Sequence, residues 1–312
     1  MKRWRSALIA GVVGALVLLA GYLIDRPPGE GGSSSAVQAA AGDAVLACTE
    51  ALRPACDALA VELGTTAGTY RSGTDPGRGT VVIAPAADLF SGLEVGDLVA
   101  RSPIAIAVWQ DRAGVLGAHC GGAINLACLS AAFGEEWEDL GGLPSWGGFK
   151  LGLADPTLSE AGLTAWRAVA GAGVPPGLEA ALRLQADGDA GLMADVLLFG
   201  TARADVVVTT EVAISGQLAN APGRGGRLVV SYPDPAPWVE YVVGTSGGRG
   251  TDDLIAGLLS DDLQSRLGAF GLRPARVETS GLADGLGTPG VALPAMDETD
   301  RTALLDSWKA LR

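Results

Sequence analysis

The stretch FKLGLADPTLSEAGLTAW, residues 149–166, shows how this chain is built. A mostly apolar run, FKLGLA, ends at Asp155-Pro156, and a helical pattern begins after Thr157 and Ser159. A short apolar run that ends at a turn is typical of a buried strand, and serine is a preferred residue at a helix N-cap. We therefore interpret the stretch as a strand, a hydroxyl-bearing turn and a helix.

The same succession recurs along the chain. Hydroxyl-bearing turns also occur at Cys48-Thr49-Glu50 and at Thr209-Thr210. Strands that alternate with helices predict an α/β fold with largely parallel sheets. In open α/β sheets, ligands bind at the carboxyl ends of the strands, where helix N-termini offer free N–H groups. Simple helix capping explains each turn equally well, so the hydroxyls alone do not establish a binding site.

Other segments complete the expected secondary structure. Apolar runs predict strands over residues 102–109, 204–211, 227–233 and 238–244. Helical patterns cover residues 177–187, 189–199 and 297–311. These elements extend the alternation of strands and helices over most of the chain.

The composition excludes several classes of protein. The 312 residues carry a formal net charge of -13, and 48% of them are hydrophobic, enough for a large core or two lobes. The acidic charge argues against nucleic acid as a partner, since that would need a basic surface. A single histidine, His119, argues against histidine-based metal or acid–base chemistry. No G-x-S-x-G turn or distinct carboxylate pair indicates a hydrolase, so we expect no enzyme, no metal site and no cofactor.

The N-terminal residues predict a membrane anchor. Residues 7–24 form an uncharged apolar run, preceded by Lys2, Arg3 and Arg5, and this charge bias places the N-terminus in the cytoplasm. We therefore expect residues 1–24 to form one transmembrane helix in the cell membrane, with the main domain extracellular. A cleaved signal peptide is the alternative. Residues 25–43, rich in Pro, Gly, Ser and Ala, are typical of a flexible stalk.

Four cysteines fit an extracytoplasmic compartment. Cys48 lies near Cys56, and Cys120 lies near Cys128, which suggests two disulfides. Zinc binding is the alternative, although neither pair has the short spacing of a zinc knuckle. A Cys48–Cys56 bond requires Cys48 to precede the helix, because eight helical residues span about 12 Å. Four cysteines allow three connectivities, and the sequence does not choose among them.

The order of segments resembles that of type 2 extracellular (periplasmic) solute-binding proteins of the molybdate and sulfate type. LVARSPIAIAVWQDR is similar to their first crossover strand, and the stretch 149–166 to their signature of a strand, Asp/Asn-Pro, Ser and Gly. ADVVVTTEVAI, RLVVSYPDP and LLSDDLQSRLGAFGLRPA resemble the ligand strand of the second lobe, the return crossover and the closing helix. The match runs from about residue 44 to 276. Some segments look closer to membrane-anchored actinobacterial proteins.

This resemblance implies a two-lobed α/β fold with two crossover strands, closing around its ligand by hinge motion. Lobe 1 would comprise residues 44–101 and 234–290, lobe 2 residues 102–233 with the crossovers, and residues 291–312 a tail helix. The residues that match ligand-contacting loops of the family are Thr49, Ser72, Thr157, Ser159, Thr209, Thr210 and Tyr232. No Arg or Lys matches a ligand position, so strong charge pairing with a dianion is not evident.

The expected function is that of a membrane-anchored receptor. It would enclose a small polar solute or an oxyanion between two lobes and pass it to a transporter, such as an ABC transporter, or to a sensor. The alternative is a binding-protein fold reused as a ligand-free module for protein interactions in the cell envelope. The brief first strand and the missing charged ligand residue motivate that alternative.

Overall fold

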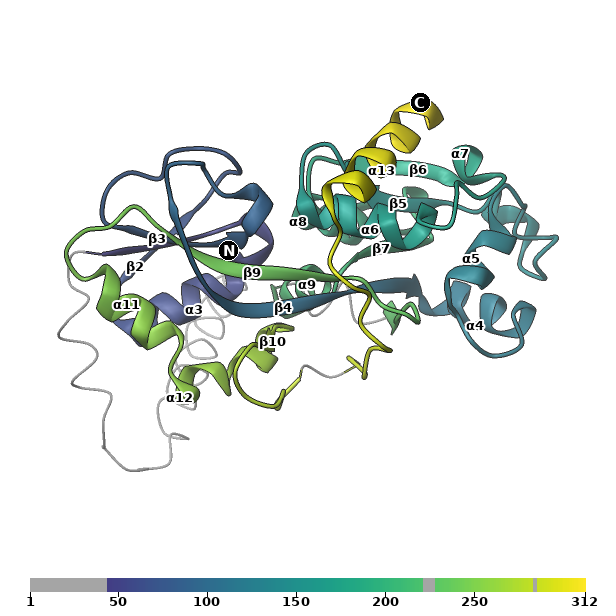
Figure 1. The fold of residues 1–312 in the computed structure, drawn as a ribbon. Helices are drawn as coiled ribbons and strands as arrows, with labels where there is room; N and C mark the ends of the chain where they lie inside the picture. Colours follow the sequence, from purple (N-terminus) through teal and green to yellow (C-terminus); the bar gives the residue numbers. More distant parts are fainter. Residues whose placement is uncertain (1–43, 221–227, 283–284) are drawn as a thin grey trace, which may run out of the picture. The chain divides into compact units, whose positions relative to one another are not determined.

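The computed structural model describes residues 44–220, 228–282 and 285–312 (Figure 1). The expected anchor, residues 1–24, and stalk, residues 25–43, lie outside the described residues. Within the described ranges, no helix combines the length and the apolar character needed to cross a membrane.

The strands of the described residues join into one mixed sheet. They are β1 Val45–Cys48, β2 Thr66–Thr69, β3 Thr80–Pro85, β4 Glu94–Trp109, β5 Leu151–Ala154, β6 Leu182–Ala186, β7 Val206–Thr210, β8 Leu228–Ser231, β9 Trp238–Thr245 and β10 Arg273–Pro274. Their order is β2-β1-β3-β9-β4-β7-β5-β6, with β8 and β10 also paired to β4. We call β1, β2, β3 and β9 with their helices the first half, and β5, β6, β7 and β8 with theirs the second half.

The long strand β4 belongs to both halves (Figure 1). Its residues 94–103 pair with β9, and its residues 104–109 pair with β7 and β8, all antiparallel. Residues 102–108 are fully buried, which explains why this part of the sequence is apolar and β-branched. The connection from β8 to β9 brings the chain back beside β4. Two crossing segments therefore join the halves, while the exact lobe boundaries given above stay predictions.

Two expectations need correction. The α/β class is found, but the sheet is mixed rather than largely parallel, because β4 and β9 pair antiparallel with their neighbours. Parallel pairing is found between β1 and its neighbours β2 and β3, and between β5 and its neighbours β6 and β7. The helix predicted over residues 177–187 is wrong: a four-residue helix, α7 Leu178–Ala181, leads into strand β6. Leu182, Leu184 and Ala186 alternate along this edge strand, which pairs with β5.

Helices cover both halves. Besides α7, the α-helices of the described residues are α3 Arg53–Leu63, α4 Gln110–His119, α5 Leu126–Ala132, α6 Glu160–Ala170, α8 Asp189–Phe199, α9 Glu211–Asn220, α11 Thr251–Leu258, α12 Asp261–Gln264 and α13 Glu298–Leu311. Short 3-10 turns are η1 Glu50–Leu52, η2 Ala86–Asp88, η3 Pro144–Trp146, η4 Gly200–Ala202 and η5 Leu267–Phe270. Helix α3 packs on β1 and β2, and helices α6 and α8 pack on β5.

Both expected disulfides are formed. Cys48 bonds to Cys56 with Cα atoms 6.1 Å apart, and Cys120 bonds to Cys128 with Cα atoms 5.5 Å apart. Cys48 is the last residue of β1 and precedes α3, as the spacing argument required. The first bond therefore ties the end of a central strand to the helix that covers it.

The Trp-rich segment after α5 packs around a buried carboxylate. Asp205 is fully buried and accepts hydrogen bonds from the indole N–H of Trp137 at 2.9 Å, from Arg112 Nε at 3.2 Å and from the backbone N–H of Lys150 at 3.0 Å. The Arg112 guanidinium lies 3.5 Å from the centre of the Trp146 ring. A buried charge with this many partners is tolerated in a core. These tryptophans therefore stabilise the second half.

The C-terminal segment packs on the second half, where Figure 1 shows α13 beside α6. The indole N–H of Trp166 in α6 donates to the Leu304 carbonyl at 3.0 Å, and its ring meets Trp308 edge-on at 5.0 Å. Upstream, Ala236 exchanges two backbone hydrogen bonds of 2.8 Å with Val291 and Leu293. The tail thus runs from the β8–β9 connection to helix α6.

Candidate functional site

The seven residues expected to contact a ligand lie just after strands or at their ends. Thr49 follows β1, Ser72 follows β2, Thr157 and Ser159 follow β5, Thr209 and Thr210 close β7, and Tyr232 follows β8. Both halves therefore contribute. The structure contains no ligand, so contact with a solute stays a prediction for each of them.

In the loop between β5 and α6, the hydroxyls have partners within the chain. Ser159 Oγ accepts the backbone N–H of Gly162 at 3.0 Å and so caps α6. Thr157 donates its backbone N–H at 2.8 Å and its hydroxyl at 2.6 Å to Asp155 Oδ1. Arg312 reaches the other oxygen of Asp155 at 3.2 Å. The loop is a capped turn whose hydroxyls bond within the chain.

Thr209 and Thr210 are buried at the end of β7 but differ in their hydrogen bonds. The Thr210 hydroxyl donates to the carboxylate of Asp189. The Thr209 hydroxyl has no hydrogen-bond partner among the described residues. A buried hydroxyl without a partner costs about 1–3 kcal/mol. Of the seven residues, Thr209 is thus the one with a fully buried, unused hydroxyl.

Three further candidates have weaker or different roles. Thr49 is half-buried and precedes η1 without a side-chain cap bond, and exposed Ser72 donates to the Asp88 carbonyl at 3.3 Å. The Tyr232 hydroxyl donates to Glu211, a fully buried carboxylate that Arg273 pairs with at 2.8 Å. Burial and the bond to Glu211 raise the pKa of Tyr232. Tyr232 therefore belongs to a buried network beside β8.

Three carboxylates that the sequence analysis did not identify lie at the same strand ends. Asp88 ends η2 after β3, Glu160 begins α6, and Asp189 begins α8. Burial, followed by the charge of Glu160, raises the pKa of Asp88 to about 6, with Asp189 adding to the effect. The Ser72 hydroxyl and the backbone N–H of Glu160 lower it. Asp88 of the first half therefore faces Glu160 and Asp189 of the second half.

A pocket of about 450 Å³, which we call the central pocket, lies beside this junction; Glu160 lines it, whereas Asp88, Asp189 and the seven expected ligand residues do not. It is lined by Pro85, Ala86, Ala87 and Arg101, by Glu160, Thr164 and Arg167 of α6, by Trp238, Val239 and Glu240 of β9, and by Ala292, Leu293, Pro294, Ala295, Met296 and Arg301 of the tail. Both halves, the strand that returns to the first half and the C-terminal segment all provide walls. Pockets of about 300–1,000 Å³ are typical of small-molecule sites.

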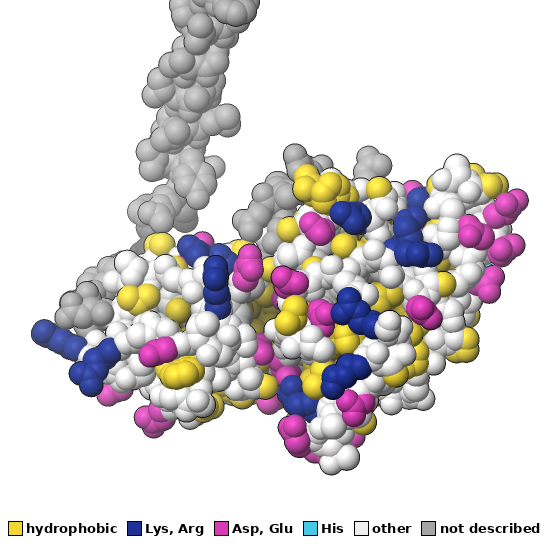
Figure 2. All heavy atoms as spheres, turned by 90° about the horizontal axis from the view of Figure 1, so that it is seen from above, with side chains coloured by type: hydrophobic (Ala, Val, Ile, Leu, Met, Phe, Trp, Pro, Cys, Tyr) yellow, Lys and Arg dark blue, Asp and Glu magenta, His cyan; other side chains and the backbone are white. Residues whose placement is uncertain are grey.

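Most charges of the central pocket are paired. Arg301 pairs with Glu160, and Arg101 pairs with Glu240 at 2.9 Å. Arg167 donates from Nη1 to the Pro294 carbonyl at 2.7 Å and forms no ion pair with any described residue. On the face shown in Figure 2, basic and acidic side chains are interspersed and form no single basic patch.

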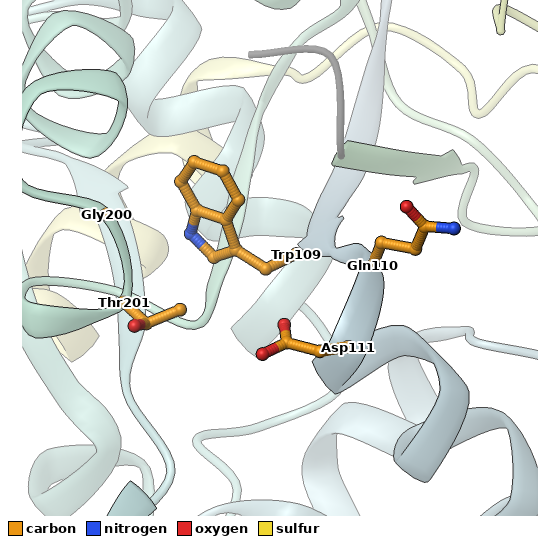
Figure 3. Close-up of a pocket in the computed structure, with 5 residues that line it drawn as sticks. All are labelled: Trp109, Gln110, Asp111, Gly200 and Thr201. Carbon is orange, nitrogen blue, oxygen red and sulfur yellow. The ribbon is translucent and has the colours of Figure 1, made fainter. Parts of the chain in front are cut away.

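A second pocket, of about 560 Å³, lies at the end of β4 and is lined by Trp109, Gln110, Asp111, Gly200 and Thr201 (Figure 3). Figure 3 shows Gln110 pointing away from Trp109. The Trp109 indole donates to the Ala204 carbonyl at 3.1 Å, and Asp111 pairs with the neighbouring Arg112 at 2.6 Å. Because the first half contributes no wall, this pocket would not sense closure of the two halves.

The described part of the chain contains no group of three or more His, Cys, Asp or Glu side chains that could hold a metal ion. Asp88, Glu160 and Asp189 make the junction acidic. Their closeness is a tertiary effect, although each is the first or last residue of a helical turn after a strand.

The fold is that of the two-lobed solute-binding proteins. A periplasmic thiamin-binding protein aligns with a TM-score of 0.56 and 11% identity, over 86% of this chain and 95% of that chain. The sulfate-binding protein of Mycobacterium tuberculosis H37Rv aligns with a TM-score of 0.50 and 13% identity, over 86% and 97%. An extracellular solute-binding protein of Bordetella parapertussis aligns with a TM-score of 0.53 and 11% identity, over 86% of this chain and 98% of that chain. No family model and no curated protein matches the sequence.

These identities show the fold alone. The expected solute-binding-protein fold is thereby confirmed, whereas the molybdate- and sulfate-type branch and the membrane-anchored actinobacterial likeness stay predictions.

Proposed function

We propose that this protein is an extracytoplasmic receptor that encloses a small polar solute between its halves and presents it to a transporter or sensor. The observation that carries this proposal is the central pocket, which takes walls from both halves. A solute held there would contact Ala87 of the first half and Arg167 of the second at once. Binding would therefore favour closure of the halves about β4 and the β8–β9 connection.

The charges at the junction bear on the class of solute. Asp88, Glu160 and Asp189 are acidic, and Arg301 is the cation paired with one of them. Two like charges 4 Å apart repel each other by about 4 kcal/mol at an effective dielectric constant of 20. Burial and then the charge of Glu160 raise the pKa of Asp88, and a dianion such as sulfate near this junction would add further repulsion. Neutral solutes or solutes with at most one negative charge are therefore favoured over doubly charged oxyanions.

The first test is thermal unfolding of the full-length chain in mild detergent with sugars, amino acids, amines, carboxylates and oxyanions. A solute at 100 times its Kd stabilises by about 2.7 kcal/mol, which raises the Tm by several degrees. Ala87→Trp should fill the central pocket and abolish the shift, whereas Ala131→Trp, at an exposed position on α5, should keep it. A solute that still binds Ala87→Trp unchanged would place binding elsewhere.

The proposed location has a separate test. Support for residues 1–24 as a membrane anchor, with the main domain outside, comes from the apolar run with its basic flank and from the two disulfides, which form in oxidising compartments. A protease added to intact cells should degrade the main domain but leave a tag at the N-terminus protected. A main domain that resists the protease until the cells are lysed would contradict this proposal.

A ligand-free envelope module is the second candidate function. The observation that favours it is the internal bonding of Thr157, Ser159, Thr210 and Tyr232, which need no ligand to satisfy them. In that case no compound of the panel would shift the Tm or reduce the radius of gyration in solution scattering. A panel compound that does both would exclude this candidate.

A further inference from the structure

The central pocket holds a positive charge, Arg167, that forms no ion pair with any described residue. Arg167 lies seven residues after Glu160 on α6, about two helical turns, so both side chains and Thr164 share one face of the helix. A guanidinium group has five N–H donors. One described bond, to the Pro294 carbonyl, holds the group in place. The remaining donors are suited to a partner from outside the chain.

The walls near this guanidinium are mostly apolar. Ala86 and Ala87 line the first half of the pocket, and Val239, Ala292 and Met296 line the return strand and tail. Ala86, Ala87 and Ala292 are exposed, as is the bond of Arg167 to Pro294, so a ligand can enter from solvent. Apolar walls beside a charge favour a ligand that carries a hydrocarbon body next to its own charge.

We infer that the central pocket binds an organic monocarboxylate, with the carboxylate on Arg167 and the hydrocarbon body against the apolar walls. A guanidinium matches a carboxylate through two parallel hydrogen bonds, a geometry that lysine does not provide. Three arginines and two glutamates line the pocket, an excess of one positive charge, so a single carboxylate balances them and dicarboxylates and sulfate should bind poorly. This inference rests on the proposed function, because it names the class of solute for the same pocket.

The experiment compares matched compounds on the full-length protein in mild detergent. Isovalerate, phenylacetate and L-leucine are titrated by calorimetry against isovaleramide, phenylacetamide, succinate and sulfate. The acids should bind at least tenfold more tightly than their amides, because a hydrogen bond to a charged group is about twice as strong as a neutral one. L-Leucine carries the same carboxylate beside an amino group and should also bind more tightly than the amides.

Three variants assign the effect to one side chain. Arg167→Gln should weaken binding of the acids by roughly ten- to hundredfold and leave the amides unaffected. Arg167→Lys keeps the charge but loses the bidentate hydrogen-bond geometry. Its affinity for the acids should lie between that of Arg167→Gln and that of the unmodified protein. Arg78→Gln, at an exposed turn of the first half, removes the same charge and should bind normally. The Tm of each variant without ligand shows whether it is folded.

The outcomes separate this inference from the function on which it rests. Equal affinity for acids and amides, or unchanged binding to a folded Arg167→Gln, overturns the monocarboxylate assignment. Binding of sugars or amines alone overturns it too but leaves the receptor function standing. If no compound of any class binds, the receptor function itself fails. An unfolded Arg167→Gln leaves the decision to the acid–amide comparison on the unmodified protein.

Discussion

Replacing Asp88 with Asn should stabilise the protein at neutral pH and have little effect in acid. Burial, and then the charge of Glu160, raises the pKa of the Asp88 carboxyl from 3.8 to about 6. A carboxyl with a raised pKa holds its proton more tightly in the folded than in the unfolded state, so its ionisation opposes folding. This opposition is fully present above pH 6 and disappears as the pH falls below about 4.

The magnitude follows from the pKa difference. A shift of about two pKa units corresponds to about 3 kcal/mol at pH 8. Asparagine keeps the size of the side chain, and the Ser72 hydroxyl donates to the backbone carbonyl of residue 88, which the substitution leaves in place. We therefore expect Asp88→Asn to raise the free energy of unfolding by about 2–3 kcal/mol and the Tm by several degrees.

The assay is urea unfolding of the unmodified protein and of Asp88→Asn at pH 8 and at pH 4. Asp139→Asn, at an exposed position outside the junction, is the matched control and should change the free energy of unfolding by less than about 0.5 kcal/mol. A variant that is less stable than the unmodified protein at pH 8 would refute the reasoning. An equal increase in the free energy of unfolding at pH 8 and at pH 4 would also refute it.

Three other changes test parts of the fold. Arg273→Met leaves the fully buried Glu211 without its cation and should lower the free energy of unfolding by about 3–5 kcal/mol. Urea unfolding measures this loss, and a loss below about 1 kcal/mol would show that the ion pair is not needed for stability. Trp308→Ala should cost about 3–5 kcal/mol and expose the tail to limited proteolysis, with an unchanged cleavage pattern as the contrary result. Replacing Cys48 and Cys56 by Ala should cost about 2–3 kcal/mol, and an unaltered Tm would contradict this account of the bond.

Much of the fold could be predicted from sequence pattern, because buried strands leave continuous apolar runs. Residues 102–109 form such a run and make up the buried end of β4. Strand β6 was misinterpreted as helix because an edge strand pairs on one side and is only half-buried, so its five residues lack an apolar run. The antiparallel pairing of β4 was also missed, since pairing direction depends on the path of the chain rather than on local pattern.

The site was less predictable. Hydroxyls after strands could be located, but whether they bond within the chain depends on contacts such as Thr210 with Asp189. Asp88 and Glu160 look like ordinary acidic residues at helical turns, and only folding brings them together. The tail wall of the pocket includes the bond from Arg167 to Pro294, which are 127 residues apart. A contact between residues so far apart in the sequence leaves no signal in the local hydrophobic pattern.

The position of β9 has a consequence for how the chain reaches this structure. β9 lies between β3 and β4 in the sheet, although the whole second half separates it from them in the sequence. During synthesis, β3 and β4 are therefore complete long before the strand that joins them exists. Unpaired strand edges attract other chains, so this interval is the stage most prone to aggregation. The half whose strands are synthesised first is therefore the half that is completed last. Nascent chains that stop before residue 238 should be the ones that most require a chaperone.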